Sequence, residues 1–126
     1  MSIVYRKHEL YPESILIRDF VGKVDVHDII DSWEFLFENK MISHKIKGVI
    51  NNLSGCDLCL DMDSFKILIA YLKKQEFLKG VKLAVICNNP KTIIFPMLVE
   101  NKESELKIKP FSTMEAAVSW AAFELD

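Results

Sequence analysis

The sequence predicts one α/β domain over residues 1–126, with strands and helices in the order ββαβαβαβα. Two apolar, β-branched runs open the chain on either side of Pro12, which indicates a β-hairpin joined by a turn. Strand-like and helix-like segments then alternate, and this alternation favours parallel strands joined by right-handed helical crossovers. The chain has 126 residues, of which 50% are hydrophobic, enough for one buried core. We therefore expect a mixed sheet flanked by helices.

The first helix has the clearest pattern. Asp25 is suited to the N-cap, and Asp28 to the first turn, where a carboxylate interacts favourably with the helix dipole. Apolar residues then recur at the spacing of one helical face: Val26, Ile29, Ile30, Trp33, Leu36 and Phe37. Because Gly22 precedes this segment, we expect it to end the second strand of the hairpin.

The later strands are predicted from short apolar runs at residues 47–53, 81–87 and 106–109. Residues 81–87 are nearly all apolar, which is typical of an interior strand covered on both faces. A polar loop is expected at residues 54–57, directly after the first of these strands. The pattern therefore predicts five strands in total.

Three further helices complete the prediction. One is expected at residues 61–77, capped by Asp61 or Asp63. The next begins at Asn89, and Pro96 is expected to bend or divide it. The last follows Ser112, where Ser112 and Glu115 have the spacing of a capping box.

Composition excludes several classes of function. The formal net charge is -2 and the sequence has no basic stripe, so we expect no nucleic-acid binding. No apolar run approaches the ~20 residues that cross a bilayer, so we expect no membrane insertion. The N-terminus lacks the pattern of a signal peptide, and three cysteines are an odd number, which together favour the cytoplasm.

Cys56 and Cys59 form a C-x-x-C motif between a predicted strand and a predicted helix. In thioredoxin-like proteins the redox-active cysteine pair occupies this position. A thioredoxin-like oxidoreductase is therefore one alternative function. Such chemistry requires a stabilised thiolate, whereas the nearby Asp57, Asp61 and Asp63 disfavour negative charge on sulfur. The competing interpretation is two small side chains that pack beneath a loop.

No other motif predicts catalysis or a bound cofactor. The four glycines are isolated, so neither a dinucleotide-binding fingerprint nor a phosphate-binding loop is present. The histidines, His8, His27 and His44, are scattered along the chain and do not form a zinc motif with the cysteines. We therefore predict no catalytic residues, no metal and no cofactor.

The C-terminal segment carries a family resemblance. Phe111, Glu115, Ala116, Ala117 and Trp120 form an F-x-x-x-E-A-A-x-x-W pattern that resembles the ending of bacterial SpoIIAA-like proteins of the STAS superfamily. The resemblance implies a five-stranded mixed sheet with four main helices and a regulatory, non-enzymatic role. In anti-sigma-factor antagonists of this superfamily, a Ser or Thr in a D-S-S/T-G motif is phosphorylated. Asp63 and Ser64 match the first two positions here, but Phe65 replaces the phosphorylated residue, so Ser64 is the remaining candidate.

The leading hypothesis is therefore a regulatory module that binds an unidentified protein partner. Ligands of open α/β sheets gather at the carboxyl ends of parallel strands, which indicates a docking region after the third strand. The candidate residues are Asn52, Ser54, Asp57, Asp63 and Ser64. A carrier of a small apolar ligand, with a pocket near Pro96, is a second alternative. A homodimer is also carried as a hypothesis, because dimers are the commonest assemblies of soluble proteins.

Overall fold

A computed structural model describes residues 2–88 and 106–123 of the protein. Its described strands form a six-stranded mixed sheet. Five strands follow the order β1-β2-β3-β5-β6, and β4 pairs separately with β2. β1 is antiparallel to β2, and the other described pairs are parallel. The strand bounds are β1 Ser2–Lys7, β2 Ile15–Asp25, β3 Gly48–Asn52, β4 Cys56–Cys59, β5 Lys82–Ile86 and β6 Lys107–Phe111.

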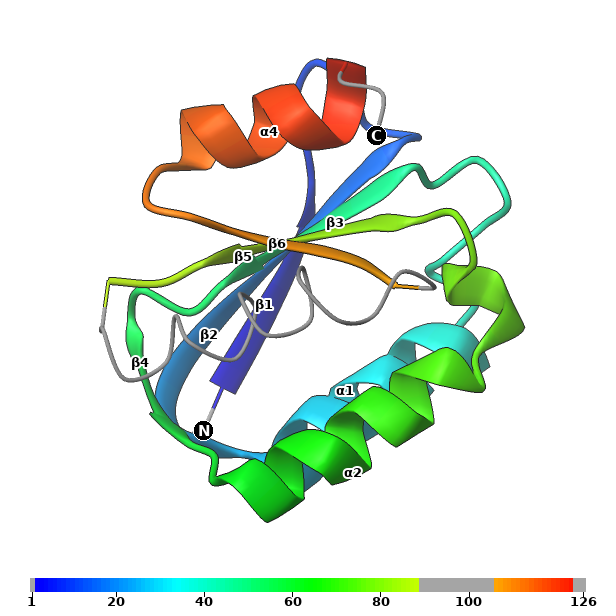
Figure 1. Ribbon diagram of the computed structural model, residues 1–126. Helices are drawn as coiled ribbons and strands as arrows, with labels where there is room; N and C mark the ends of the chain where they lie inside the picture. The colour runs from blue at the N-terminus through cyan, green and yellow to red at the C-terminus, as the bar shows by residue number, and fades with distance from the viewer. Residues whose placement is uncertain (1, 89–105, 124–126) are drawn as a thin grey trace.

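Helices cover both faces of this sheet (Figure 1). α1 (Val26–Glu38) and α2 (Met62–Lys73) lie side by side on one face, and α4 (Met114–Phe123) lies on the other. A short 3-10 helix, η1 (Glu76–Leu78), follows α2 and leads into β5. The prediction of a mixed α/β sheet flanked by helices is therefore confirmed.

One strand, β4, was not predicted, and another, β2, extends further than predicted. β2 does not stop at Gly22 but continues to Asp25, and its last four residues pair with β4. Gly22 has φ of 87°, a conformation that residues with a Cβ adopt rarely, so the strand changes direction here without ending. The prediction of five strands is wrong, because part of the segment expected to be a loop is β4.

The helix starts were predicted with mixed success. Asp25 and Asp28 form the capping box of α1, which confirms the expected start of that helix. Asp61 caps α2, but this helix ends at Lys73, before η1. The predicted capping box of Ser112 and Glu115 is wrong: Thr113 accepts the capping hydrogen bond, from the backbone N–H of Ala116. The helix expected from Asn89, with Pro96, lies outside the described residues.

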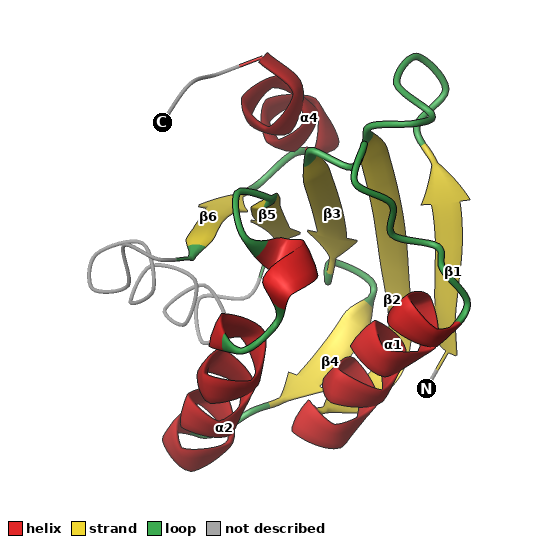
Figure 2. Cartoon of the chain, turned by 90° about the vertical axis from the view of Figure 1, so that its right-hand side faces the viewer, coloured by secondary structure: helices red, strands yellow, loops and turns green. Residues whose placement is uncertain are grey.

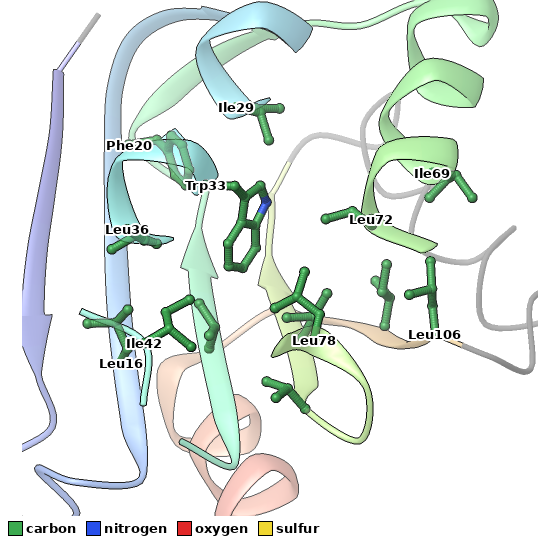
Figure 3. Close-up of a cluster of buried hydrophobic side chains, with 14 of the residues drawn as sticks. Leu16, Phe20, Ile29, Trp33, Leu36, Ile42, Ile69, Leu72, Leu78 and Leu106 are labelled. Atoms are coloured by element: carbon green, nitrogen blue, oxygen red, sulfur yellow. The ribbon is translucent and has the colours of Figure 1, made fainter. Parts of the chain in front are cut away.

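Two apolar clusters hold the helices to the sheet. The larger cluster lies beneath α1 and α2 and includes Phe20, Trp33, Leu36 and Leu72. In Figure 3, the side chain of Trp33 extends from α1 toward the sheet, and the side chain of Leu72 extends from α2 toward Trp33. The smaller cluster joins α4 to the opposite face of the sheet, through residues such as Ile17, Ile50 and Ala121. Successive side chains of a strand alternate between these two clusters.

Candidate functional site

Asn52 and Ser54, two of the predicted docking residues, belong to one hydrogen-bonded group at the carboxyl end of β3. The Asn52 amide donates to Asp19 Oδ1 (2.9 Å), and Asn52 Oδ1 accepts from the Ser54 hydroxyl (2.6 Å). Arg6 Nε donates to the other oxygen of Asp19 at 2.7 Å. This group lies on the α4 side of the sheet, because Asp19 follows Ile15 and Ile17 of the α4-side cluster at alternate positions. Its side chains are half-buried or exposed.

Asp63 and Ser64 lie elsewhere, in the first turn of α2. The side chain of Asp61 accepts a hydrogen bond from the backbone N–H of Ser64 (2.8 Å), which satisfies one of the open donors at the helix start. This bond holds the pKa of Asp61 below its usual value. Asp63 is exposed and Ser64 is half-buried, so both are accessible from solvent.

β4 separates these two groups, and Asp57 lies within it (Figure 2). Asp57 is exposed, and its strand leads from the end of β3 to the start of α2. Among the described residues, no hydrogen bond joins Asn52 or Ser54 to Asp63 or Ser64. The five predicted docking residues therefore form a strip along β4 and its two ends, and not a single cluster.

Cys56 and Cys59 are the two ends of β4, a placement that the loop prediction did not anticipate. Residues three apart in a strand point to opposite faces, and their Cα atoms are about 10 Å apart. A disulfide requires Cα atoms within about 7 Å, so the two thiols cannot pair in this conformation. Burial, together with the charge of Asp57, raises the pKa of Cys56 to about 11. The geometry therefore does not support the thioredoxin-like alternative.

The structure also reveals a polar group that the sequence analysis did not identify. Arg18 lies in the middle of β2, on the face covered by α1 and α2, and is 2% exposed. Its Nε donates to Asn51 Oδ1 (2.9 Å), Nη2 donates to the same oxygen, and Nη1 donates to the Ser32 hydroxyl (2.8 Å). Asn51 in turn donates to the backbone oxygen of Ala84 (3.0 Å). We call Arg18, Asn51 and Ser32 the buried arginine group.

Aromatic rings surround the guanidinium of Arg18. Its central carbon lies 3.9 Å from the centroid of the Trp33 ring and 4.9 Å from that of Phe20. Such contacts stabilise a cation through the quadrupole of the ring. Burial nevertheless lowers the pKa of Arg18 to about 9, because removal from water disfavours the charged form. The charge of Arg18 is thus stabilised by the dipoles of Asn51 and Ser32 and by the ring faces of Trp33 and Phe20, and not by a described carboxylate.

A cavity of about 90 Å³ adjoins the buried arginine group. Arg18 and Asn51 are its polar lining residues, and the other described lining residues are apolar. They come from the sheet, α1, β4 and α2, and include Trp33, Leu58, Phe65 and Leu68. A mostly apolar lining with a few fixed polar groups is typical of a small-molecule site.

The described part of the chain contains neither a metal-binding cluster nor a membrane-spanning helix. No three His, Cys, Asp or Glu side chains of residues 2–88 and 106–123 are grouped closely enough to hold a metal ion. None of the helices in these same ranges has the length and apolar character needed to cross a membrane.

Comparisons with known proteins agree with the fold. No profile of a known protein family and no curated protein matches the sequence. Among solved structures, an uncharacterised Shewanella loihica protein with a SpoIIAA-like fold matches with a TM-score of 0.59 and 20% identity. The match covers 95% of this chain and 92% of the other.

Two anti-sigma factor antagonists have the same arrangement. The Mycobacterium paratuberculosis protein has a TM-score of 0.60 and 16% identity, over 95% of this chain and 92% of its own. The antagonist SpoIIAA, in its unphosphorylated form, has a TM-score of 0.55 and 9% identity, over 94% of this chain and 96% of its own. The strand order, the helices on both faces and these three matches together establish that the chain has a SpoIIAA-like fold.

Proposed function

We propose that this protein is a non-enzymatic regulatory module that binds a protein partner through β4 and the first turns of α2. The observation that carries the proposal is the surface of α2. Met62 and Ile67 expose 46% and 54% of their surface there, beside the exposed Asp63. Large apolar side chains that are exposed and rimmed by polar residues are typical of a protein-binding surface.

The named structural neighbours support a regulatory role. Two of them are anti-sigma factor antagonists, whose name implies that they act on another protein. At identities of 16% and 9%, this likeness shows a shared fold and does not identify the partner of this chain. We infer a protein partner for the present chain because the surface of α2 provides a place where one could bind.

Ser64 is the residue through which this binding could be regulated. A phosphate on its hydroxyl would add negative charge beside Asp61 and Asp63, and like charges at this spacing repel. Phe65, which replaces the expected phosphorylated residue, is half-buried and lines the cavity under α2. It is therefore packed inward and offers no hydroxyl for the same modification.

The test is a quantitative cross-linking pull-down from lysate of the source cells, with the wild type and a D63A/S64A variant. We expect a captured protein whose recovery falls at least about tenfold in the variant, which corresponds to a loss of about 1.4 kcal/mol in binding. The matched control is E115A/S119A, which removes an acid and a hydroxyl from exposed positions on α4.

Equal recovery with the wild type, the control and D63A/S64A would contradict the proposal, provided that all three melt at similar temperatures. An S64D variant tests the regulatory step separately, because it adds charge without removing Asp63. We expect it to lower recovery of the same protein, and unchanged recovery would remove Ser64 as the regulated residue.

The cytoplasmic location and the homodimer remain parts of this proposal. Cys56 and Cys59 are free thiols, which agrees with a reducing compartment. Light scattering of the purified protein measures the assembly directly. The apolar-ligand alternative had placed its pocket near Pro96, which lies outside the described residues, whereas the described cavity lies beside Arg18.

A further inference from the structure

No carboxylate of residues 2–88 and 106–123 pairs with the charge of Arg18. Among the described residues, the nearest polar partners of the guanidinium are the neutral side chains of Asn51 and Ser32. An isolated charge in the interior is costly unless it is paired, and natural proteins usually pair a buried arginine with a carboxylate. Arg6, by contrast, has such a partner at the surface, where it forms an ion pair with Asp19 at 2.7 Å.

The guanidinium also has hydrogen-bonding capacity that the described residues leave unused. Arginine carries five N–H groups in a rigid planar fork. Three of them donate to Asn51 and Ser32, and one N–H on each terminal nitrogen has no acceptor among residues 2–88 and 106–123. Charge-assisted hydrogen bonds from guanidinium N–H groups to the oxygens of a carboxylate are among the strongest in proteins.

The cavity is lined in part by Arg18, the residue that carries these donors. Arg18 and Asn51 are its polar lining residues, and Leu58, Leu60, Phe65 and Leu68 form part of its apolar wall. Its volume is about 90 Å³. An apolar cavity of about 150 Å³ accommodates benzene, so this one fits a molecule with a few carbon atoms.

We propose that this cavity binds a short-chain monocarboxylate, with the carboxylate on Arg18 and the alkyl chain among the apolar side chains of β4 and α2. A carboxylate supplies the missing negative charge and accepts from the unused N–H groups. Phosphate and sulfate also carry negative charge, but they have no apolar portion to occupy the remainder of the cavity. The lowered pKa of Arg18 agrees with a cation that lacks its counter-ion. This site uses the inward-facing side chains of β4 and α2, such as Leu58 and Phe65, whereas the surface proposed for the protein partner uses exposed side chains of the same elements.

The experiment is a titration of the 15N-labelled full chain with butyrate, followed by NMR signals of the Arg18 side chain and the Trp33 indole. Butyramide, which has the same shape without the charge, is the neutral control, and chloride controls for ionic strength. We expect saturable shifts with butyrate, with at least about tenfold weaker effects of butyramide. We also expect butyrate to bind more tightly than acetate, because its chain occupies the apolar wall.

Two kinds of variant test the two ends of the site. R18M removes the charge, and L58W fills the cavity while Arg18 remains in place; each is expected to weaken butyrate binding at least about tenfold. R6M, which removes the exposed arginine that pairs with Asp19, is the matched control and is expected to bind as the wild type does. If R18M does not fold, R18K replaces it, because it keeps the charge but loses the planar fork.

Several results would overturn the proposal. Equal shifts with butyrate and butyramide would mean that charge is not recognised, and equal shifts with chloride would mean an adventitious ion only. Equal affinity for acetate and butyrate would show that the apolar wall does not contribute to binding. Unchanged butyrate binding in L58W would place the ligand elsewhere. None of these results bears on the pull-down with D63A/S64A, so the two proposals fail separately.

Discussion

The two faces of the sheet differ in how completely they are closed. On the α4 face, small residues allow close contact: a Cβ added to Gly48 would lie 2.7 Å from Cβ of Ala121. On the α1/α2 face, large side chains surround the buried arginine group and leave a cavity of about 90 Å³. At Gly48 the α4 face has no room for an added methyl group, whereas the α1/α2 face contains both free volume and a charge.

Consecutive residues make the contrast sharper. Arg18 and Asp19 are neighbours in β2, and Asn51 and Asn52 are neighbours in β3, but each pair divides between the two faces. Asp19 and Asn52 meet at a half-exposed site where Arg6 balances the carboxylate. Arg18 and Asn51 meet in the interior, where no described carboxylate balances the guanidinium. A function that needs a buried charge is therefore expected on the α1/α2 face.

The largest effect is expected from Asn51→Leu. This change removes the oxygen that accepts two N–H groups of Arg18, so a buried cation loses its main acceptor. We expect the free energy of unfolding to fall by about 3 kcal/mol, since hydrogen bonds to charged groups contribute about 1.5–3 kcal/mol each. Urea denaturation measures this. The matched control is Asn52→Leu on the half-exposed face, for which we expect a loss below about 1 kcal/mol.

The double variant R18M/N51L shows whether the loss comes from the uncompensated charge. Replacing both polar partners by apolar groups removes the need to satisfy either, so its loss should be smaller than the sum of the single losses by at least about 1 kcal/mol. Additive losses would mean that Arg18 and Asn51 stabilise the fold independently. The buried arginine group would then be ordinary packing, and the contrast between the faces would be weaker.

An intermediate effect on stability is expected when one carbon atom is added to each face of the sheet. Gly48→Ala places a methyl group against Ala121 and Ile15, and we expect overpacking to cost about 1–3 kcal/mol. Val85→Ile adds a methylene at the wall of the cavity, and we expect stability to stay the same or rise by up to about 0.8 kcal/mol. Thermal and urea unfolding report both values.

Gly55→Ala is the control for the loss of a glycine itself. A Cβ there would meet the backbone oxygen of Phe20 at 3.5 Å, which is an ordinary contact, so we expect a change within about 0.5 kcal/mol. If V85I were as destabilising as G48A, the cavity would not tolerate added volume, and the two faces would be equally close-packed.

Local signals explain what the sequence could predict. The spacing of apolar residues in α1 and the nearly continuous apolar run of β5 depend on neighbouring residues, and both elements were identified. β4 has four residues, alternately half-buried and exposed, and its partner is the extension of β2 beyond Gly22. Because that pairing depends on tertiary structure, the segment resembled a polar loop, and the separation of Asn52 from Ser64 was missed with it.

The buried arginine group was missed for a related reason. A single arginine within residues 15–19 has no periodic signal that indicates burial, since charged residues are usually exposed. Its acceptors come from β3 and α1, distant in sequence. One signal was available: Arg18 lies two residues from both Leu16 and Phe20, and residues two apart in a strand share a face.

The smallest effect concerns Asp19 on the half-exposed face. Burial raises the pKa of this carboxyl, but hydrogen bonds from Arg6 and Asn52 lower it by more, so the pKa lies below its usual value. An acid with a lowered folded-state pKa stabilises the fold above its unfolded pKa of about 3.9, and this contribution is lost as pH falls through the folded value.

We therefore expect D19N to be less stable than the wild type at pH 7 by at most about 1 kcal/mol, because Arg6 is half exposed to solvent. The difference should shrink as pH falls below about 4 in urea unfolding, whereas D31N, which removes an exposed carboxylate from α1, should follow the wild type. A D19N deficit that persists undiminished at pH 2.5 would mean that the shape of the side chain, and not its charge, stabilises this face, and Asp19 would then resemble the uncharged partners of Arg18.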